Sequence, residues 1–252
     1  MRLAELLRAN TTMQRKALII GCPDEKIPGV NDDMRNYRAF FESPAGGGWL
    51  SSEIKTLQSP SMLEVQREMK ELTSADYSIV VFAGHGEYSH DTRSTQLHLG
   101  PDIRIDEYML KEGAPRHTLI IDACRVHSDT PLLEQIKRSS LALASLPDVS
   151  LSRMAFDNHL RKCRPDVAVM YACKIGEAAG DSPGQGGTYS STLLSESREW
   201  ASNSINQKTG VLSVSEVHAL AVPLVYRQRG GRQTPTGVFP RTVPHFPFAI
   251  CA

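Results

Sequence analysis

Two short apolar runs between Tyr77 and Val126 constrain the fold of this chain more than any other feature. The first reads Y-S-I-V-V-F-A and leads into His85 between two glycines, and the second reads H-T-L-I-I-D and leads into Cys124. Continuous apolar runs bounded by turn residues are typical of strands buried on both faces of a parallel sheet. Because ligands bind outside the carboxyl ends of such strands, we expect His85 and Cys124 to face each other.

The flanking sequence alternates between strand and helix patterns, which predicts a parallel α/β sheet with right-handed crossovers. Predicted strands cover 16–21, 53–57, 166–173 and 246–251, and predicted helices cover 31–42, 61–72, 149–164, 189–202 and 213–227. Asn31-Asp32-Asp33 offers a cap for the first of these helices, and Pro223 is expected to interrupt or end the last. A surface hairpin over 96–105, a short helix over 106–112 and a long loop over 125–147 complete the prediction.

Composition excludes several classes of protein. Lys plus Arg and Asp plus Glu both number 28, so net charge gives no reason to expect nucleic acid or an acidic membrane as a partner. No run approaches the 18 apolar residues of a spanning helix, and residues 1–10 read as a short amphipathic helix rather than a signal peptide. The five cysteines show no disulfide or zinc spacing, so we expect free thiols, no metal site and a cytoplasmic location.

A thiol beside an imidazole is the arrangement of a nucleophile and its base. Glycine on each side of His85 allows close approach of a substrate and leaves backbone N–H groups for an oxyanion. A lone buried cysteine is also a common small apolar residue, and a histidine among glycines is also a common turn residue. From spacing alone, a thiol hydrolase and a purely structural pair both remain open.

The segments F-A-G-H-G-E and I-I-D-A-C-R, with K-A-L-I-I-G and G-V-N-D-D before them, resemble the caspase-like cysteine peptidases. The likeness is closest to bacterial orthocaspases and metacaspases and runs from Lys16 to the end. Y-A-C-K-I-G-E-A-A-G and G-T-Y-S-S-T-L-L are similar to the segment after the fifth strand, and R-Q-T-P with F-P-F-A-I to the closing turn and strand. Asp122 and Val126 stand where the caspase signature has Gln and Gly, which favours the metacaspase branch.

The resemblance implies a three-layer α/β sandwich. Its sheet of about six strands has the order 2-1-3-4-5-6, with the last strand antiparallel and helices on both faces. The peptidase domain would cover 16–252 after an N-terminal helical extension over 1–15. Within it, a part similar to the caspase large subunit would extend to about 138, and a small-subunit-like part would begin at about 148.

The implied reaction is peptide hydrolysis by a Cys-His dyad. Cys124 would attack the scissile carbonyl, and His85 would protonate the leaving amine and then activate water. Backbone N–H groups of Gly86 and Cys124 would hold the oxyanion. No third acid is assigned, because the family uses a dyad.

Acidic residues predict the specificity. Asp33 and Asp122 match acids that line a basic P1 pocket in metacaspases, and Asp181 or Glu177 could complete it from the glycine-rich loop over 176–187. No Arg or Lys occurs in that loop or in 28–33. Since guanidinium pairs with carboxylates through two hydrogen bonds, Arg is the first P1 choice and Lys the second.

The family's linker after the nucleophile strand is often cleaved, so Arg138, and after it Lys137, are candidates for self-cleavage in the 125–147 loop. The expected partners are protein or peptide substrates. A regulatory protein or an activating protease is a further possible partner, and the sequence does not predict the oligomeric state. No cofactor is expected. Some metacaspases need calcium, but no motif here indicates a calcium site. Two alternatives remain: a catalytically silent caspase-like scaffold or adaptor, and another α/β thiol hydrolase such as a glutaminase.

Overall fold

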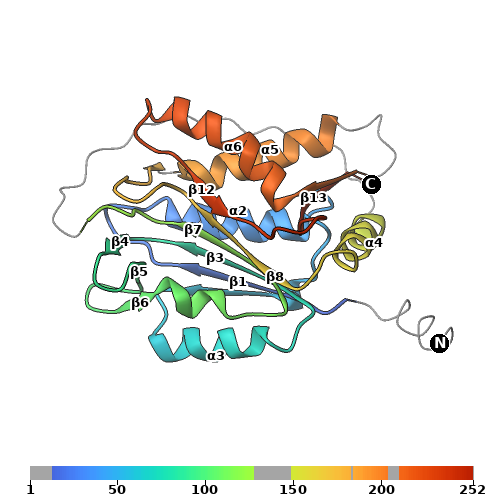
Figure 1. The fold of residues 1–252 in the computed structure, drawn as a ribbon, viewed down its shortest axis with the longest axis horizontal. Coiled ribbons are helices and arrows are strands. Elements are labelled where there is room, and N and C mark those ends of the chain that lie inside the picture. The colour runs from blue at the N-terminus through green and yellow to red at the C-terminus, as the bar shows by residue number, and fades with distance from the viewer. Residues whose placement is uncertain (1–12, 128–148, 183, 204–209, 252) are drawn as a thin grey trace.

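The computed structural model describes residues 13–127, 149–182, 184–203 and 210–251. A six-stranded sheet lies at its centre, in the order β2-β1-β3-β7-β8-β12 (Figure 1). All neighbouring strands are parallel except β12, which runs antiparallel to β8. Counted along the chain, this is the predicted order 2-1-3-4-5-6. The strands are β1 (Arg15–Gly21), β2 (Ile54–Gln58), β3 (Tyr77–Ala83), β7 (Arg116–Asp122), β8 (Asp166–Tyr171) and β12 (Thr236–Val238).

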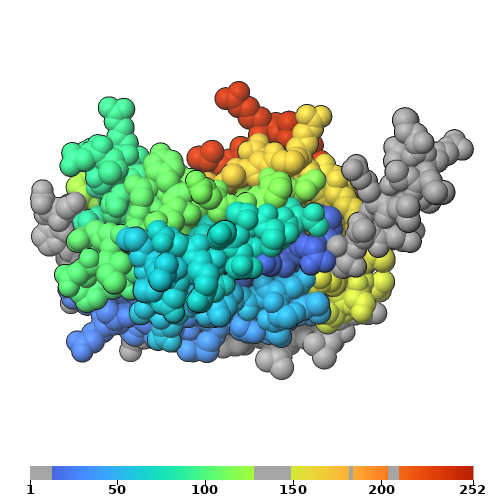
Figure 2. All heavy atoms as spheres, turned by 90° about the horizontal axis from the view of Figure 1, so that it is seen from below, coloured from blue at the N-terminus to red at the C-terminus, as the bar shows by residue number. Residues whose placement is uncertain are grey.

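Helices cover both faces of the sheet and complete the predicted three-layer sandwich. One face carries α3 (Met62–Leu72), and α5 and α6 lie on the opposite side of the sheet (Figure 1). Figure 2 shows the α3 face from outside, with α3 in cyan beside the green segment that follows β3. The second face is covered by α2 (Val30–Glu42), α4 (Val149–Leu160), α5 (Thr188–Asn203) and α6 (Val214–Gln228).

Successive residues of each central strand enter different cores. In β1, Leu18 and Ile20 pack with the apolar side of α3, whereas Ile19 packs with residues of α2, α4, α5 and α6. Every residue of β3 is buried. Strands with both faces covered favour apolar residues on both sides, which is why the runs in the sequence are nearly continuous rather than alternating.

A small antiparallel sheet begins directly after His85. It consists of β4 (Gly86–Ser89), β5 (Ser94–His98) and β6 (Arg104–Asp106), so the predicted hairpin is confirmed and gains a third strand. A 3-10 helix over Glu107–Lys111 follows, where a short helix was predicted. A two-residue pair, β9 (Asp181–Ser182) and β10 (Gly186–Gly187), lies in the glycine-rich loop.

The predicted closing strand forms, but not in the central sheet. It is β13 (Pro247–Cys251), which pairs with β11 (Gly210–Ser213), while β12 takes the sixth place. Its aromatic side chains explain this position. Phe248 stacks on Phe40 of α2 with ring centroids 5.3 Å apart, and the preceding Phe246 lies 5.6 Å from the ring of Tyr77. The strand is therefore held in the helical layer by burial of apolar area.

Two predicted helix features are wrong. Asn31-Asp32-Asp33 does not cap α2, because the helix already begins at Val30 and Gly29 occupies the cap position without a side-chain hydrogen bond. Pro223 does not end α6, which continues to Gln228. Buried apolar residues lie on both sides of the proline in α6, and this packing outweighs the one backbone hydrogen bond that proline removes.

The predicted helix over residues 1–10 and most of the predicted loop over 125–147 lie outside the described residues. Within the described ranges, no helix is long and apolar enough to cross a membrane.

A buried cation joins the start of the sheet to α4. The Arg15 guanidinium lies against the rings of Trp49 and Phe156, 4.6 and 4.8 Å from their centroids, and donates hydrogen bonds to two backbone carbonyls. It also pairs with Asp157 at 3.5 Å and Glu53 at 3.7 Å. Burial lowers the pKa of Arg15 to about 10, although Asp157 opposes the shift, so the residue stays charged at neutral pH.

Replacing this cation tests its structural role. Arg15→Met should lower the free energy of unfolding by about 3–5 kcal/mol, because the Asp157 carboxylate would be left buried without its partner. The double variant with Asp157→Asn should recover part of the loss, since it removes the unpaired charge as well. Urea unfolding at pH 7 measures both. A loss below about 1 kcal/mol in Arg15→Met would show that the pair is not a structural requirement.

Candidate active site

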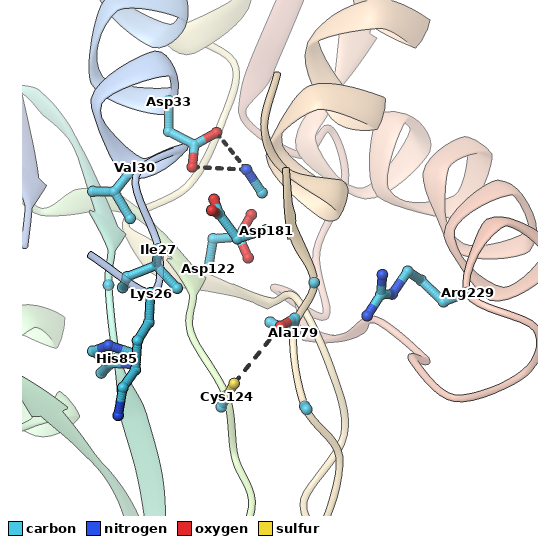
Figure 3. A pocket seen from close by; sticks show the side chains of 14 residues that line it. Lys26, Ile27, Val30, Asp33, His85, Asp122, Cys124, Ala179, Asp181 and Arg229 are labelled. Carbon is cyan, nitrogen blue, oxygen red and sulfur yellow. Dashed lines mark hydrogen bonds between the residues drawn. The ribbon is translucent and has the colours of Figure 1, made fainter. Parts of the chain in front are cut away.

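The strand register places His85 and Cys124 side by side in the fold. In the parallel pair β3–β7, Ala83 is the partner of Asp122, the last residue of β7. His85 and Cys124 each follow two residues later, so both leave the same edge of the sheet at the same height. They line one pocket, with His85 on one side and Cys124 facing it across the opening (Figure 3).

This pocket is small and mixes acidic with basic side chains. Its volume is about 60 Å³, well below the roughly 300–1,000 Å³ usual for drug-sized ligands. It suits a single side chain of a larger substrate better than a whole cofactor. Its lining comes from the loop after β1, the first turn of α2, the ends of β3 and β7, the glycine-rich loop and the end of α6.

In this structure Cys124 is a buried thiol. Its Sγ donates to the carbonyl oxygen of Ala179 over 3.7 Å. Burial raises the pKa of Cys124 and the Asp122 carboxyl adds to the shift, while the positive charge of Arg229 opposes it. The thiol must therefore leave the Ala179 carbonyl and lose its proton before it can act as a nucleophile, because the thiolate is the reactive form. All five cysteines are free.

The backbone of Gly86 approaches the Cys124 peptide closely. A Cβ atom at position 86 would lie 2.8 Å from the Cys124 carbonyl oxygen. Gly86 faces Leu97 in a non-hydrogen-bonded pair of β4 and β5, so its N–H points away from β5. Two residues later, on the same side of β4, the Tyr88 N–H donates to the Val126 carbonyl at 2.9 Å. The Gly86 N–H is thus directed toward the segment that carries Cys124.

Three of the four predicted acids gather at the inner end of the pocket. Asp33 comes from the first turn of α2, Asp122 from the end of β7 and Asp181 from β9 (Figure 3). The Gly187 N–H donates to both oxygens of Asp33, at 2.9 and 3.0 Å, and the Ser190 N–H donates to Asp122 at 2.9 Å. Backbone donors, which carry no net charge, hold these carboxylates.

The glycines of β10 permit this packing. A Cβ atom at Gly186 would lie 2.0 Å from an Asp33 oxygen, and one at Gly187 would lie 2.2 Å from an Asp122 oxygen. Gly186 also has a φ of 88°, in the region that favours glycine. A side chain at either position would displace a carboxylate, so the glycine-rich loop is a requirement of the acidic cluster.

Burial shifts the pKa values of Asp33 and Asp122 in the same direction. Burial raises the pKa of Asp33 well above its ordinary value, and the neighbouring Asp122 contributes to the shift. Burial likewise raises the pKa of Asp122 to about 6, with a contribution from Asp181. Near neutral pH this end of the pocket therefore holds carboxyl groups that a positively charged ligand would stabilise in their ionised form.

Glu177, the fourth predicted acid, does not line the pocket. Its carboxylate accepts hydrogen bonds from the backbone N–H and the hydroxyl of Thr234, at 2.7 and 3.2 Å, and pairs with Lys174 at 3.0 Å. It fastens the segment before β12 to the glycine-rich loop. Arg138 and Lys137, the candidate cleavage sites, lie outside the described residues.

Sequence reasoning missed three polar residues around the pocket. Asp24 accepts a hydrogen bond from the His85 ring at 2.8 Å, and Lys26 and Arg229 belong to the lining. Asp24 follows β1, the neighbour of β3, so the rule that carboxyl ends of parallel strands share one edge could have found it. Arg229 follows α6, more than 100 positions after Cys124, and no local pattern points to it. Among the described residues, no three His, Cys, Asp or Glu side chains are grouped to hold a metal ion.

A comparison with known families agrees with this geometry. The family model for the caspase domain of the C14 peptidases matches residues 14–242. No curated protein is similar enough to the chain to count as a match. The matched range contains all six strands of the central sheet together with His85 and Cys124. The chain therefore belongs to the caspase-domain family of the C14 peptidases.

Proposed function

We propose that this chain is a cysteine endopeptidase that cleaves peptide bonds after Arg and, less readily, after Lys. The observation that carries the proposal is the shared pocket in which His85, Cys124 and three carboxylates meet. In this proposal Cys124 is the nucleophile and His85 the base at the opening of the pocket, and the carboxylates indicate that a positively charged side chain would fill it.

Catalysis would proceed in two steps. The Cys124 thiol transfers its proton to His85, and the thiolate attacks the scissile carbonyl carbon. The N–H groups of Gly86 and Cys124 stabilise the oxyanion, and the imidazolium protonates the leaving amine as the C–N bond breaks. In the second step His85 takes a proton from water, the hydroxide attacks the thioester, and the proton returns to the departing sulfur.

The acidic cluster would set the specificity. The groups that raise the pKa values of Asp33 and Asp122, besides burial, are other carboxyls. A substrate guanidinium would relieve this repulsion and could bind two carboxylates at once. A Lys ammonium carries the same charge but lacks the planar fork, which is why Arg is preferred.

One observation favours a second candidate, a catalytically silent scaffold. The Cys124 thiol is hydrogen-bonded to the Ala179 carbonyl, and burial is the main cause of its raised pKa. Hydrogen bonds at catalytic sites are often long or misaligned before substrate binds, so this resting state is also compatible with an active peptidase. Labelling by a peptide with a P1 Arg and a thiol-reactive group separates the two.

The nucleophile is tested by Cys124→Ala. This variant should lose all hydrolysis of fluorogenic P1-Arg peptides, assayed with and without calcium, and should keep its circular dichroism spectrum because the side chain is small. His85→Ala should retain the fold and lose a factor of about 10²–10⁴ in rate. Cys251→Ala is the matched control and should keep full activity. Turnover that persists in Cys124→Ala would refute the assignment.

Asp122→Asn tests the pocket by separating activity from stability. Because the folded state raises the pKa of Asp122 to about 6, it binds more protons than the unfolded chain between about pH 4 and 6. The stability of the wild type should therefore fall as pH rises through that window. Asp122→Asn should remove the part of this loss that Asp122 causes, at most about 2–3 kcal/mol at pH 7, while the part due to the raised pKa of Asp33 remains. It should also greatly reduce turnover of P1-Arg peptides.

Urea unfolding from pH 4 to 8, P1-Arg turnover and iodoacetamide labelling of Cys124 give the three readouts. Labelling should change far less than turnover, because the nucleophile remains. Asp102→Asn, in an exposed turn, is the control for loss of one negative charge. A wild type that prefers P1 Asp, or an Asp122→Asn variant with unchanged P1-Arg turnover, contradicts the acidic pocket.

Self-processing would follow from the same specificity. Cleavage after Arg138, or secondarily after Lys137, should appear in the intact mass of purified wild type and be absent from Cys124→Ala. Both fragments should stay together, because β7 before the cut and β8 after it are paired along their length. Cleavage at this site in both proteins would identify a contaminating protease instead, and an intact wild type would leave the segment as a connector.

A further inference from the structure

His85 is in contact with an acid that the dyad does not include. Its Nε2 atom lies 2.8 Å from Oδ2 of Asp24, with 26% of the His85 side chain exposed to solvent. Asp24 lies in the loop after β1, and β1 is the neighbour of β3 in the sheet. The contact therefore links two adjacent strand ends.

The Asp24 carboxylate is itself held in place. Its other oxygen, Oδ1, accepts the backbone N–H groups of Lys26 and Ile27 at 2.8 and 3.0 Å. One oxygen thus orients the carboxylate on its own loop, and the second remains for the imidazole. Partial burial acts to raise the pKa of Asp24, but hydrogen bonds from His85 and from this backbone outweigh it and lower the pKa, so the group is ionised at neutral pH.

Charged and titratable groups surround His85 from several elements. Lys26 shares its pocket, Cys124 faces it from the end of β7, and the ring of His98 in β5 lies 6.4 Å away, centroid to centroid. Glu87 in β4 is paired with Arg104 at 3.0 Å and with His98 at 3.7 Å. Among the described residues, Asp24 is the acid that is hydrogen-bonded to the His85 ring.

A carboxylate at Nε2 determines the protonation state of the ring. Because the ionised Asp24 can only accept, Nε2 must carry a proton, and in the neutral ring Nδ1 is then the basic nitrogen. The same carboxylate stabilises the imidazolium that forms when Nδ1 takes a proton. These are the two tasks of an acid that orients a catalytic histidine.

We propose that Asp24 is a positioning residue for His85, which holds the Nε2–H tautomer and leaves Nδ1 to exchange protons with Cys124 and the leaving amine. The role rests on the proposed peptidase function. Nδ1 takes the thiol proton as the thiolate forms and gives it to the amine nitrogen as the C–N bond breaks. Asp24 itself gains and loses no proton.

Asp24→Asn tests the role in the full-length protein. Asparagine has one oxygen, which cannot serve both the backbone donors and the ring. We expect kcat for P1-Arg peptides to fall about tenfold with little change in KM; the effect is smaller than for a buried acid, because 46% of the Asp24 side chain is exposed. The limb of the pH profile set by the imidazole should move to lower pH, since the imidazolium loses its partner.

Glu25→Gln is the matched control, because it removes the same charge from an exposed position of the same loop. It should leave kcat and the pH profile unchanged. If Asp24→Asn behaves like Glu25→Gln in both measurements, the positioning role is overturned. Urea unfolding verifies that both variants are folded.

A second readout does not depend on activity. In Cys124→Ala protein, ¹⁵N NMR of the His85 ring should show a protonated Nε2, and adding Asp24→Asn should shift the ring toward the other tautomer. If the wild type has no peptidase activity but its His85 tautomer still depends on Asp24, the proposed function is rejected and the effect of Asp24 on the ring is confirmed. If the wild type is active but Asp24→Asn changes neither the His85 tautomer nor kcat, the positioning role alone is rejected.

Discussion

The site depends on the register between β3 and β7. Pairing of Ala83 with Asp122 puts His85 and Cys124 at equal distances beyond the sheet. A shift of one residue would move one of them by about 3.3 Å and turn every side chain of that strand to the opposite face. The two cores prevent such a shift, because alternate residues of each strand are buried against α3 or against the other helices. Apolar packing thus sets the geometry of the polar site.

Two groups of buried ionisable residues in this molecule have opposite electrostatic environments. Arg15 is surrounded by carboxylates, carbonyls and aromatic rings, so it remains a charged structural element. Asp33 and Asp122 line one pocket, where they repel each other electrostatically and accept hydrogen bonds from backbone N–H groups, and burial raises the pKa of each. A fold optimised for stability alone would not keep like charges together in this way. Strongly perturbed carboxyls in a cleft are typical of functional sites.

Local sequence predicted the parts of the structure that local chemistry determines. The continuous apolar runs predicted the buried strands, and the residues directly after them predicted the positions of His85 and Cys124. Contacts between distant segments were beyond that reasoning. Glu177 is hydrogen-bonded to Thr234, 57 positions away in the sequence, and Asp24 is hydrogen-bonded to the His85 ring, 61 positions away. The closing strand has an ordinary strand pattern, and only the aromatic rings that bury it decide which sheet it joins.

The closeness of Asp122 and Cys124 has a consequence for when the thiol becomes reactive. The Asp122 carboxyl disfavours the thiolate while the pocket is empty. A guanidinium bound beside Asp122 would cancel that negative field and lower the energy of the thiolate two residues away. In the proposed peptidase, a P1-Arg substrate would thereby activate the thiol that attacks it. An idle molecule would hold a protonated sulfur, which is slow to react with peroxide or stray electrophiles.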